Sequence, residues 1–240
     1  MKEPYTQQWS FNTQYGFGSY LMELGYVGTK GTHLNANYRA NQALQASPEH
    51  PIHDQTTNTT ANINLRVPIL GFSSNGLSEY NNVFDSSYHS MQASLRKQYA
   101  NHLSFQLSYT WSHSIDNVSA SSGGRNQPIG GYTGDIYNHR GNRGSSSFDR
   151  THRFVASYVY ELPTLSQNAF TKNVLGGWAI SGVSTIQTGL PFSITDATAG
   201  NIFGATSYAQ FAAGKSASDA VLSGKTQTRL ARYFDTSIFT

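Results

Sequence analysis

The sequence of 240 residues contains no cysteine, few charged residues and no long apolar run. The absence of cysteine excludes disulfide frameworks, cysteine-based zinc sites and thiol catalysis. Charged residues make up 12% of the chain, against about 25% in ordinary soluble domains. This argues against a helical bundle, because helix surfaces are built mainly from charged residues and alanine. No stretch approaches the ~20 apolar residues that a membrane-spanning helix needs.

Two targeting and binding signals are also missing. The basic residues are scattered, with Arg96 and Lys97 the only adjacent pair, so no electrostatic stripe forms and we expect no nucleic-acid partner. The first residues contain no apolar segment followed by a small-residue cleavage site, so they are not a secretory signal. Either the protein stays inside the cell, or its targeting sequence lies upstream of this chain.

What the chain does contain is strand-forming sequence. Aromatic residues make up 13% of it, which is too apolar for a disordered tract. Residues 9–17 and 20–27 alternate apolar and polar side chains around a Gly18-Ser19 turn, which predicts a β-hairpin. A second hairpin is predicted from residues 88–99 and 103–111, joined by a short turn.

Two further strands are predicted over residues 154–160 and 178–194. The last would be about 17 residues long, whereas globular strands average about 5 or 6 and a bilayer-crossing strand needs about 9 to 11 plus what projects beyond it. The connections alternate between short turns and long Gly/Ser/Asn/Thr-rich stretches, at 29–87, 113–149 and from 195. All long loops therefore lie on one side, as in outer-membrane barrels.

The fold class expected is all-β: an antiparallel up-and-down transmembrane β-barrel segment, forming an open curved sheet of an incomplete barrel with long extracellular loops. One side-chain parity is expected to face lipid and to supply the aromatic girdles: Trp9, Phe11, Tyr15, Phe17, Tyr20, Tyr26, Leu103, Phe105, Leu107, Tyr109, Trp111, Phe154, Tyr158, Tyr160, Trp178 and Ile180. The charges expected to point into the lumen are Glu23, Arg96, Arg153 and Glu161. On the lipid face each would cost up to ~2 to 4 kcal/mol at mid-bilayer.

Two groups of residues resemble a metal site and phosphate-binding loops, but their sequence context argues against both. His50 and His53 with Asp54 resemble a metal pair, but Pro51 forbids the regular helix that would align the imidazoles, which favours a polar loop. The Gly123-Gly124-Arg125 and Gly130-Gly131-Tyr132 runs do not lie between a strand and a helix, so they are flexible loop and not phosphate cradles.

Ser145, Asp149 and His152 are triad-type residues, but no Gly-x-Ser-x-Gly elbow surrounds them. We expect a hydrogen-bonded loop anchor instead, with Asp149 paired to Arg150 or Arg153. The outer-loop residues placed to reach a ligand are Tyr132, Tyr137, Arg140 and Arg143.

Several segments together resemble the barrel of the Oar-like TonB-dependent outer-membrane receptors, which are abundant in acidobacteria. They occur in that family's order and cover most of the chain: PYTQQW (4–9), YVGTKGTHL (26–34), YHSMQASLRK (88–97), SYTWSHSID (108–116), FDRTHRF (148–154), GGW (176–178) and QTGLPF (187–192).

The resemblance implies residues 1–240 as part of the receptor's β-barrel domain in the outer membrane of a Gram-negative bacterium, taking up an unidentified solute. It implies no enzymatic activity, no cofactor and no metal. The signal peptide, the plug domain and the final barrel strands of such receptors are absent from this chain, whose last residues, 232–240, resemble a loop before those strands. The implied partners are outer-membrane lipid, the missing plug and strands, and the TonB complex through that plug.

Two alternatives belong to other classes. A secreted or surface β-sandwich that binds glycans would bury the stripe of Leu103, Phe105, Leu107 and Tyr109 between two sheets. A small outer-membrane pore would pair its first and last strands.

We predict that this chain by itself does not form a stable transporter. Six strands cannot close at the family's diameter, and each unpaired backbone group in hydrocarbon costs several kcal/mol. Refolding into detergent should give no heat-modifiable, protease-resistant monomer on gel electrophoresis, and the appearance of such a monomer would contradict the prediction.

Overall fold

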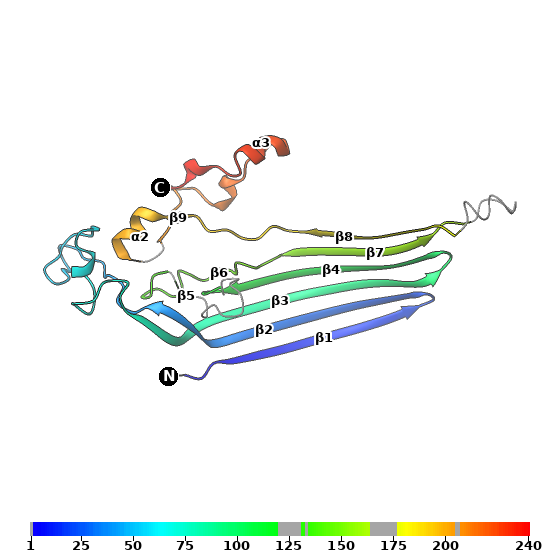
Figure 1. The fold of residues 1–240 in the computed structure, drawn as a ribbon, viewed down its shortest axis with the longest axis horizontal. Helices are drawn as coiled ribbons and strands as arrows, with labels where there is room; N and C mark the ends of the chain where they lie inside the picture. The colour runs from blue at the N-terminus through cyan, green and yellow to red at the C-terminus, as the bar shows by residue number, and fades with distance from the viewer. Residues whose placement is uncertain (1, 120–130, 133, 164–176, 205–206) are drawn as a thin grey trace. The chain divides into compact units, whose positions relative to one another are not determined.

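In the computed structural model, which describes residues 2–119, 131–132, 134–163, 177–204 and 207–240, the chain divides into two compact units (Figure 1). The sheet unit comprises Met1–Tyr38, Tyr80–Tyr132 and Asn138–Pro191. The loop unit comprises Arg39–Glu79, Thr133–Tyr137 and Phe192–Thr240.

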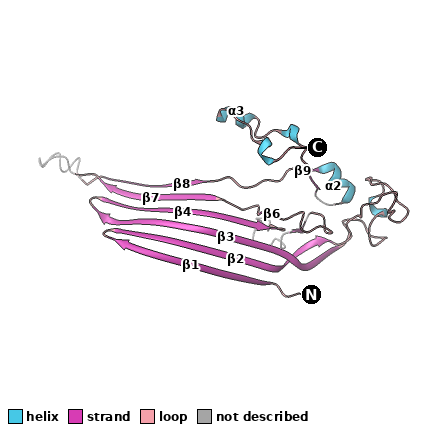
Figure 2. Ribbon diagram, turned by 180° about the vertical axis from the view of Figure 1, so that it is seen from behind, coloured by secondary structure: helices cyan, strands magenta, loops and turns pink. Residues whose placement is uncertain are grey.

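The sheet unit is built on one antiparallel sheet with the strand order β1-β2-β3-β4-β7-β8 (Figure 2). Its strands are β1 (Tyr5–Phe17), β2 (Tyr20–Arg39), β3 (Ser78–Ala100), β4 (Leu103–Asp116), β7 (His152–Glu161) and β8 (Ala179–Gln187). Two short strands extend it at the ends of longer ones: β5 (Gly131–Tyr132) pairs in parallel with β2, and β6 (Gly144–Ser145) pairs with β4. Each main strand pairs with its neighbours along the chain, which confirms the up-and-down topology.

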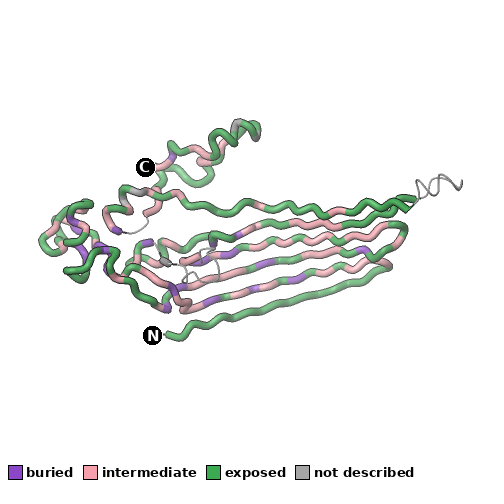
Figure 3. Tube along the Cα trace, viewed as in Figure 1, coloured by how far each residue is buried: buried purple, intermediate pink, exposed green. Residues whose placement is uncertain are grey.

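The sheet is open. Strands β1 and β8 are the two ends of the strand order and do not pair with each other, so the described residues form no small closed pore. No second sheet covers the stripe that a sandwich would bury, because Leu103, Phe105 and Leu107 are half-exposed and Tyr109 is exposed. Figure 3 shows β1 exposed along its whole length, while the buried positions lie on the inner strands.

Both predicted tight turns are present. Gly18 has a φ of 56° in the turn between β1 and β2. Asn101 and His102 have φ values of 53° and 63° between β3 and β4, as a two-residue turn matching the strand twist requires. The Lys97 ammonium group closes this second turn by donating to the carbonyls of Ala100 (2.7 Å) and Leu103 (3.2 Å).

Three strand limits differ from the prediction. β2 continues to Arg39 and β3 begins at Ser78, so the connection predicted over residues 29–87 is shorter. Most of the added part of β2 lies beyond its pairing with β1, which ends at Thr32, and pairs with β5 at Asn37 and Tyr38. Most of the added part of β3 likewise lies beyond its pairing with β4, which begins at Ser86. The residues added to β2 show little alternation. The strand predicted over 178–194 is wrong in length: β8 has 9 residues and ends at Gln187. The Gly189 and Pro191 that follow disfavour further ladder pairing, since proline has no N–H to donate.

Aromatic rings lie over glycines on the neighbouring strand at two places in the sheet. Trp9 pairs with Gly28, and a Cβ added to Gly28 would lie 2.3 Å from Cε2 and Nε1 of the indole. Tyr158 pairs with Gly182, where an added Cβ would lie 2.9 Å from the phenol oxygen. In both pairs the ring occupies the space that a side chain on the glycine would need.

The loop unit contains short elements only. They are η1 (Ile63–Leu65), β9 (Thr195–Asp196), α2 (Ala197–Phe203), β10 (Ser207–Tyr208), η2 (Ala217–Ala220), α3 (Thr226–Ala231) and η3 (Thr236–Ile238). β9 and β10 form a separate two-stranded antiparallel sheet. In the part of the chain that the structure describes, no helix is both long enough and apolar enough to cross a membrane.

A buried arginine organises the loop unit. Arg66 is completely buried, and its guanidinium donates to Oδ1 of Asn62 (3.0 Å) and Asn58 (2.9 Å) and to the carbonyls of Leu44 and Ile202 (2.5 Å each). Burial lowers the pKa of this guanidinium from its usual value, but arginine stays protonated in proteins. Its charge is therefore balanced by oxygen dipoles without a carboxylate.

Asn41 plays a similar role and is also completely buried. Its amide group donates to the carbonyls of Ile69 (3.0 Å) and Phe72 (3.1 Å), and its oxygen accepts from the Ile69 N–H (2.9 Å). Side-chain hydrogen bonds to backbone thus hold this unit together where the sequence offers little apolar core.

We predict that Gly28→Ala displaces the Trp9 indole and destabilises the sheet by about 1–3 kcal/mol, the usual cost of overpacking. The measurement is chemical unfolding of the full-length protein in detergent micelles, with the Trp9 emission taken as the difference between each variant and its Trp9→Phe counterpart. Gly16→Ala is the matched control, because nothing lies within 4 Å of its Cβ position. An unchanged Trp9 emission in the Gly28 variant would refute the proposed contact.

We also predict that Arg66→Met loosens the loop unit by about 3 kcal/mol, because several buried oxygens lose a charged donor at once. Hydrogen exchange of the backbone amides in residues 39–79 measures this opening free energy. Arg229→Met should leave that exchange unchanged, since the Arg229 side chain is exposed on α3. Equal exchange in both variants would show that Arg66 is dispensable.

Candidate functional site

The candidate functional site is the pair of faces of the large sheet. In an antiparallel pair, directly opposed residues project to the same face, and successive residues project to opposite faces. The register of the paired strands therefore assigns their side chains to two surfaces. We call them the apolar face and the polar face.

The apolar face carries the predicted lipid-facing residues. On β1 and β2, Phe11 opposes Tyr26 and Phe17 opposes Tyr20. On β4, β7 and β8, Phe105 opposes Tyr158, and the same parity continues across the sheet. The ring contact of Tyr20 with Phe105, 6.4 Å between centroids, joins the two halves on one side. Residues of the predicted set that share this face are Trp9, Phe11, Tyr15, Phe17, Tyr20, Tyr26, Leu103, Phe105, Leu107, Tyr109, Trp111, Phe154, Tyr158, Tyr160 and Ile180.

Trp178 lies just before β8, where its carbonyl accepts from the Leu162 N–H at 2.8 Å.

Several side chains of the apolar face are strongly exposed to solvent: Phe11 is 69% exposed and Ile186 is 68% exposed. Exposed apolar side chains over a whole sheet face mark a surface that something apolar covers.

Two histidine–tyrosine pairs lie on the apolar face, toward the strand ends that are farther from the short turns. His89 shares a hydrogen bond of 2.7 Å with the Tyr26 hydroxyl, and its ring lies 6.1 Å from that of Trp9. His152 shares one of 2.8 Å with the Tyr109 hydroxyl and pairs with Trp111. Rings with a polar tip gather in this way where an apolar surface meets water.

The polar face carries the four predicted lumen charges. Glu23 opposes Gln14, Arg96 opposes Gln106, Arg153 opposes Thr110 and Glu161 opposes Ala179. Their neighbours on this face are mainly hydroxyl and amide residues, and the apolar exceptions are Leu21 and Val27 on β2 and Val155, Val159, Ala179 and Val183 on β7 and β8.

The acids of the polar face are held by local donors, unlike its arginines. Glu23 accepts from Gln14 (3.1 Å) and Ser94 (3.4 Å). Glu161 accepts a short hydrogen bond from the Tyr99 hydroxyl, and His102 lies 3.9 Å from it. Among the described residues, Arg96 and Arg153 form no ion pair.

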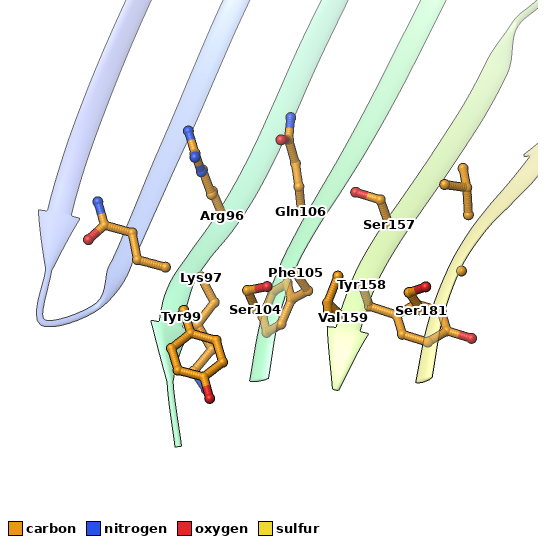
Figure 4. A pocket seen from close by; sticks show the side chains of 13 residues that line it. Arg96, Lys97, Tyr99, Ser104, Phe105, Gln106, Ser157, Tyr158, Val159 and Ser181 are labelled. Atoms are coloured by element: carbon orange, nitrogen blue, oxygen red, sulfur yellow. The ribbon is translucent and has the colours of Figure 1, made fainter. Parts of the chain in front are cut away.

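The polar face is hollowed near the turn between β3 and β4. The hollow has a volume of about 650 Å³ and its polar lining includes Arg96, Gln106, Ser157, Ser104 and Ser181 (Figure 4). Arg96, Gln106 and Ser157 come from three neighbouring strands and point the same way in that view.

The triad-type residues do not assemble. Asp149 is buried, shares a hydrogen bond with Nδ1 of His113 (2.9 Å) and accepts from the Ser114 N–H (2.8 Å). His152 bonds Tyr109 instead, and Ser145 lies in β6. The expected pairing of Asp149 with Arg150 or Arg153 is wrong, because the end of β4 supplies closer donors. Asp149 is nevertheless the loop anchor that was predicted.

The His50–His53 pair has a structural role. His53 and Asp54 have φ values of 44° and 63° and form a turn closed by backbone bonds between Ile52 and Gln55 (2.9 Å). His53 also shares a 2.9 Å bond with the Leu65 carbonyl. Within the described ranges no group of three metal-ligating side chains gathers.

The loop residues expected near a ligand are dispersed. Tyr137 donates to the Gln42 carbonyl (3.1 Å) in the loop unit, while Arg143 donates to Ser87 (3.2 Å) in the sheet unit. Arg140 is exposed. The Tyr132 side chain and the residues Gly123, Gly124, Arg125 and Gly130 lie outside the described part of the chain.

Sequence reasoning missed some members of both faces. His89 and Met91 share the apolar face, and Ser104, Gln106 and Ser157 line the hollow. Their parity was readable in the alternation of the strands. What was missing was the pairing that brings them side by side.

Comparison with known proteins identifies the family. A family model described as the outer membrane beta barrel domain matches residues 1–240. No curated protein and no solved structure matches significantly. The match covers the chain from end to end, and the sheet is antiparallel with one apolar and one polar face. The protein therefore belongs to the outer membrane beta-barrel domain family and is located in the outer membrane of Gram-negative bacteria.

Proposed function

We propose that this chain forms part of the barrel wall of a TonB-dependent receptor that takes up a solute through the outer membrane. The observation that carries the proposal is the sorting of side chains between the two faces. The apolar face would contact lipid, with the set from Trp9 to Ile180 as its surface and girdles. The polar face, with Glu23, Arg96, Arg153 and Glu161, would line a water-filled lumen.

Charge supports this orientation. Exposed Arg96 and Arg153 on the lipid side would each cost up to ~2 to 4 kcal/mol at mid-bilayer. Lys97 has the parity of the apolar face, but it is buried and its ammonium group is bonded to the turn carbonyls. The opposite orientation would place exposed Phe11 and Ile186 in water.

The open edges define the structural partners that the proposal needs. Strands β1 and β8 each present one unpaired row of backbone N–H and C=O groups. In hydrocarbon such groups must be bonded, so further barrel strands would pair with both edges. TonB dependence rests on the resemblance of the strand motifs to Oar-like receptors, and the plug domain of such a receptor would be the part that contacts the TonB complex. The role is one of transport, without a catalysed reaction, a cofactor or a nucleic-acid partner.

Two single-cysteine variants at adjacent positions of β4 test the orientation of the two faces, because the chain contains no other cysteine. Leu107→Cys and Ser108→Cys are a matched pair: both positions are half-exposed, and they project to opposite faces. In outer membranes, a water-soluble maleimide should label the Ser108 variant and leave the Leu107 variant unlabelled. Labelling of the Leu107 variant alone, or of both variants at equal rates, would refute the proposed faces.

The same Ser108→Cys variant tests TonB dependence. In energised cells, movement of the plug should raise the labelling rate above that in cells lacking TonB. Equal labelling rates in cells with and without TonB would indicate a passive barrel. They would not change the conclusion about the orientation of the faces.

A further inference from the structure

The hollow on the polar face presents a compact set of donors. Arg96, Gln106 and Ser157 form one cross-strand row, since Arg96 opposes Gln106 and Gln106 opposes Ser157. With neighbouring strands about 4.8 Å apart, this row spans roughly 10 Å. Ser104 and Ser181 belong to a second row, with Val159 between them, that lies two residues closer to the turns and roughly 7 Å away. The patch therefore has the dimensions of a six-carbon sugar derivative.

The charge that this patch offers is that of Arg96, because the Glu161 carboxylate at its border on β7 is bonded to the hydroxyl of Tyr99, which lines the hollow. The Arg96 side chain is exposed and has no ion pair among the described residues. Lys97 does not compete, because it is 8% exposed and its ammonium group is bonded to the turn carbonyls. No carboxylate lines the hollow. Glu23 lies on β2, beyond β3 from the hollow, where Gln14 and Ser94 hold it.

The chemistry of the donors matches an oxyanion that also carries hydroxyl groups. A guanidinium fork binds carboxylate or phosphate through two parallel hydrogen bonds. The Gln106 amide and the serine hydroxyls can each donate to and accept from hydroxyl groups. Val159 and Val183 line the same hollow and offer an apolar surface to the C–H groups of such a molecule.

We propose that this hollow binds a small polyhydroxylated anion, with Arg96 holding its carboxylate or phosphate group and the amide and serine rows holding its hydroxyls. The proposal rests on the proposed function in one respect, namely that the polar face meets a water-filled lumen. The volume of about 650 Å³ lies within the range of roughly 300–1,000 Å³ that is typical of small-molecule sites.

Three open-chain six-carbon compounds of nearly equal size and different charge test the proposal. The full-length protein, purified from outer membranes into nanodiscs, is titrated with gluconate, sorbitol and glucamine, and binding is measured calorimetrically. Gluconate should bind at least about 10-fold more tightly than sorbitol, because hydrogen bonds to a charged group are stronger than those between neutral groups. Glucamine should bind no better than sorbitol. Equal affinities for gluconate and sorbitol would overturn the proposal.

Arginine variants locate the site. Arg96→Gln keeps an amide in place of the guanidinium but loses the charge, so it should reduce gluconate affinity to the level of sorbitol. Arg153→Gln is the matched control, since Arg153 shares the polar face but does not line the hollow. Its gluconate affinity should stay unchanged. An Arg96→Gln variant that binds gluconate like the parent protein, or an Arg153→Gln variant that loses the same affinity, would refute the site.

The labelling pattern of cysteines at 107 and 108 separates the two proposals. If it shows the expected orientation while Arg96→Gln has no effect, the hollow is refuted and the barrel function stands. If it is inverted, the barrel function itself is refuted. Gluconate bound at Arg96 with the expected labelling supports both.

Discussion

The structure of the sheet unit depends on the hydrogen-bond ladder between antiparallel neighbours. Because side chains alternate with a period of two, a slip of one residue in any pair would move a whole strand's apolar set to the other face. The ladders keep Phe11 beside Tyr26, Phe105 beside Tyr158 and Tyr160 beside Ile180. Face sorting and the arrangement of the hollow both follow from that register. The positive φ values of Asn101 and His102 permit the two-residue turn that joins β3 to β4, and the ladder shifts register once before it, between Lys97 and Ala100.

The two units solve different burial problems. The sheet unit has few buried apolar side chains, and its exposed apolar face is consistent with a protein whose surroundings are hydrocarbon. The loop unit combines phenylalanine ring contacts, such as those of Phe192 with Phe234 and Phe211 with Phe239, with the buried Arg66 and Asn41, whose side chains satisfy backbone carbonyls. These polar contacts are costly to disturb, because each oxygen left without a donor loses a hydrogen bond that water does not replace.

Charge on the polar face is arranged unevenly. Its acids are satisfied by nearby neutral donors, Glu23 by Gln14 and Ser94 and Glu161 by Tyr99, whereas Arg96 has no such partner. A carboxylate that already accepts hydrogen bonds attracts a cation less strongly than a guanidinium without an ion pair attracts an anion. A barrel wall of this kind would favour anions locally although its formal charges are balanced. This asymmetry is the physical basis for the anion site proposed at the hollow.

The sequence by itself determined the alternation, the tight turns and thus the membership of each face, because these are local signals. Trp9, Leu107 and Tyr158 were assigned to one surface and Arg96 to the other from parity alone. Tertiary structure decided what depends on partners distant in sequence. β2 continues to Arg39, with β5 paired to its end, β8 stops at Gln187, and Asp149 bonds His113 and Ser114 instead of the adjacent arginines. The hollow likewise exists only through pairing, since Arg96, Gln106 and Ser157 come from three strands that no local pattern brings together.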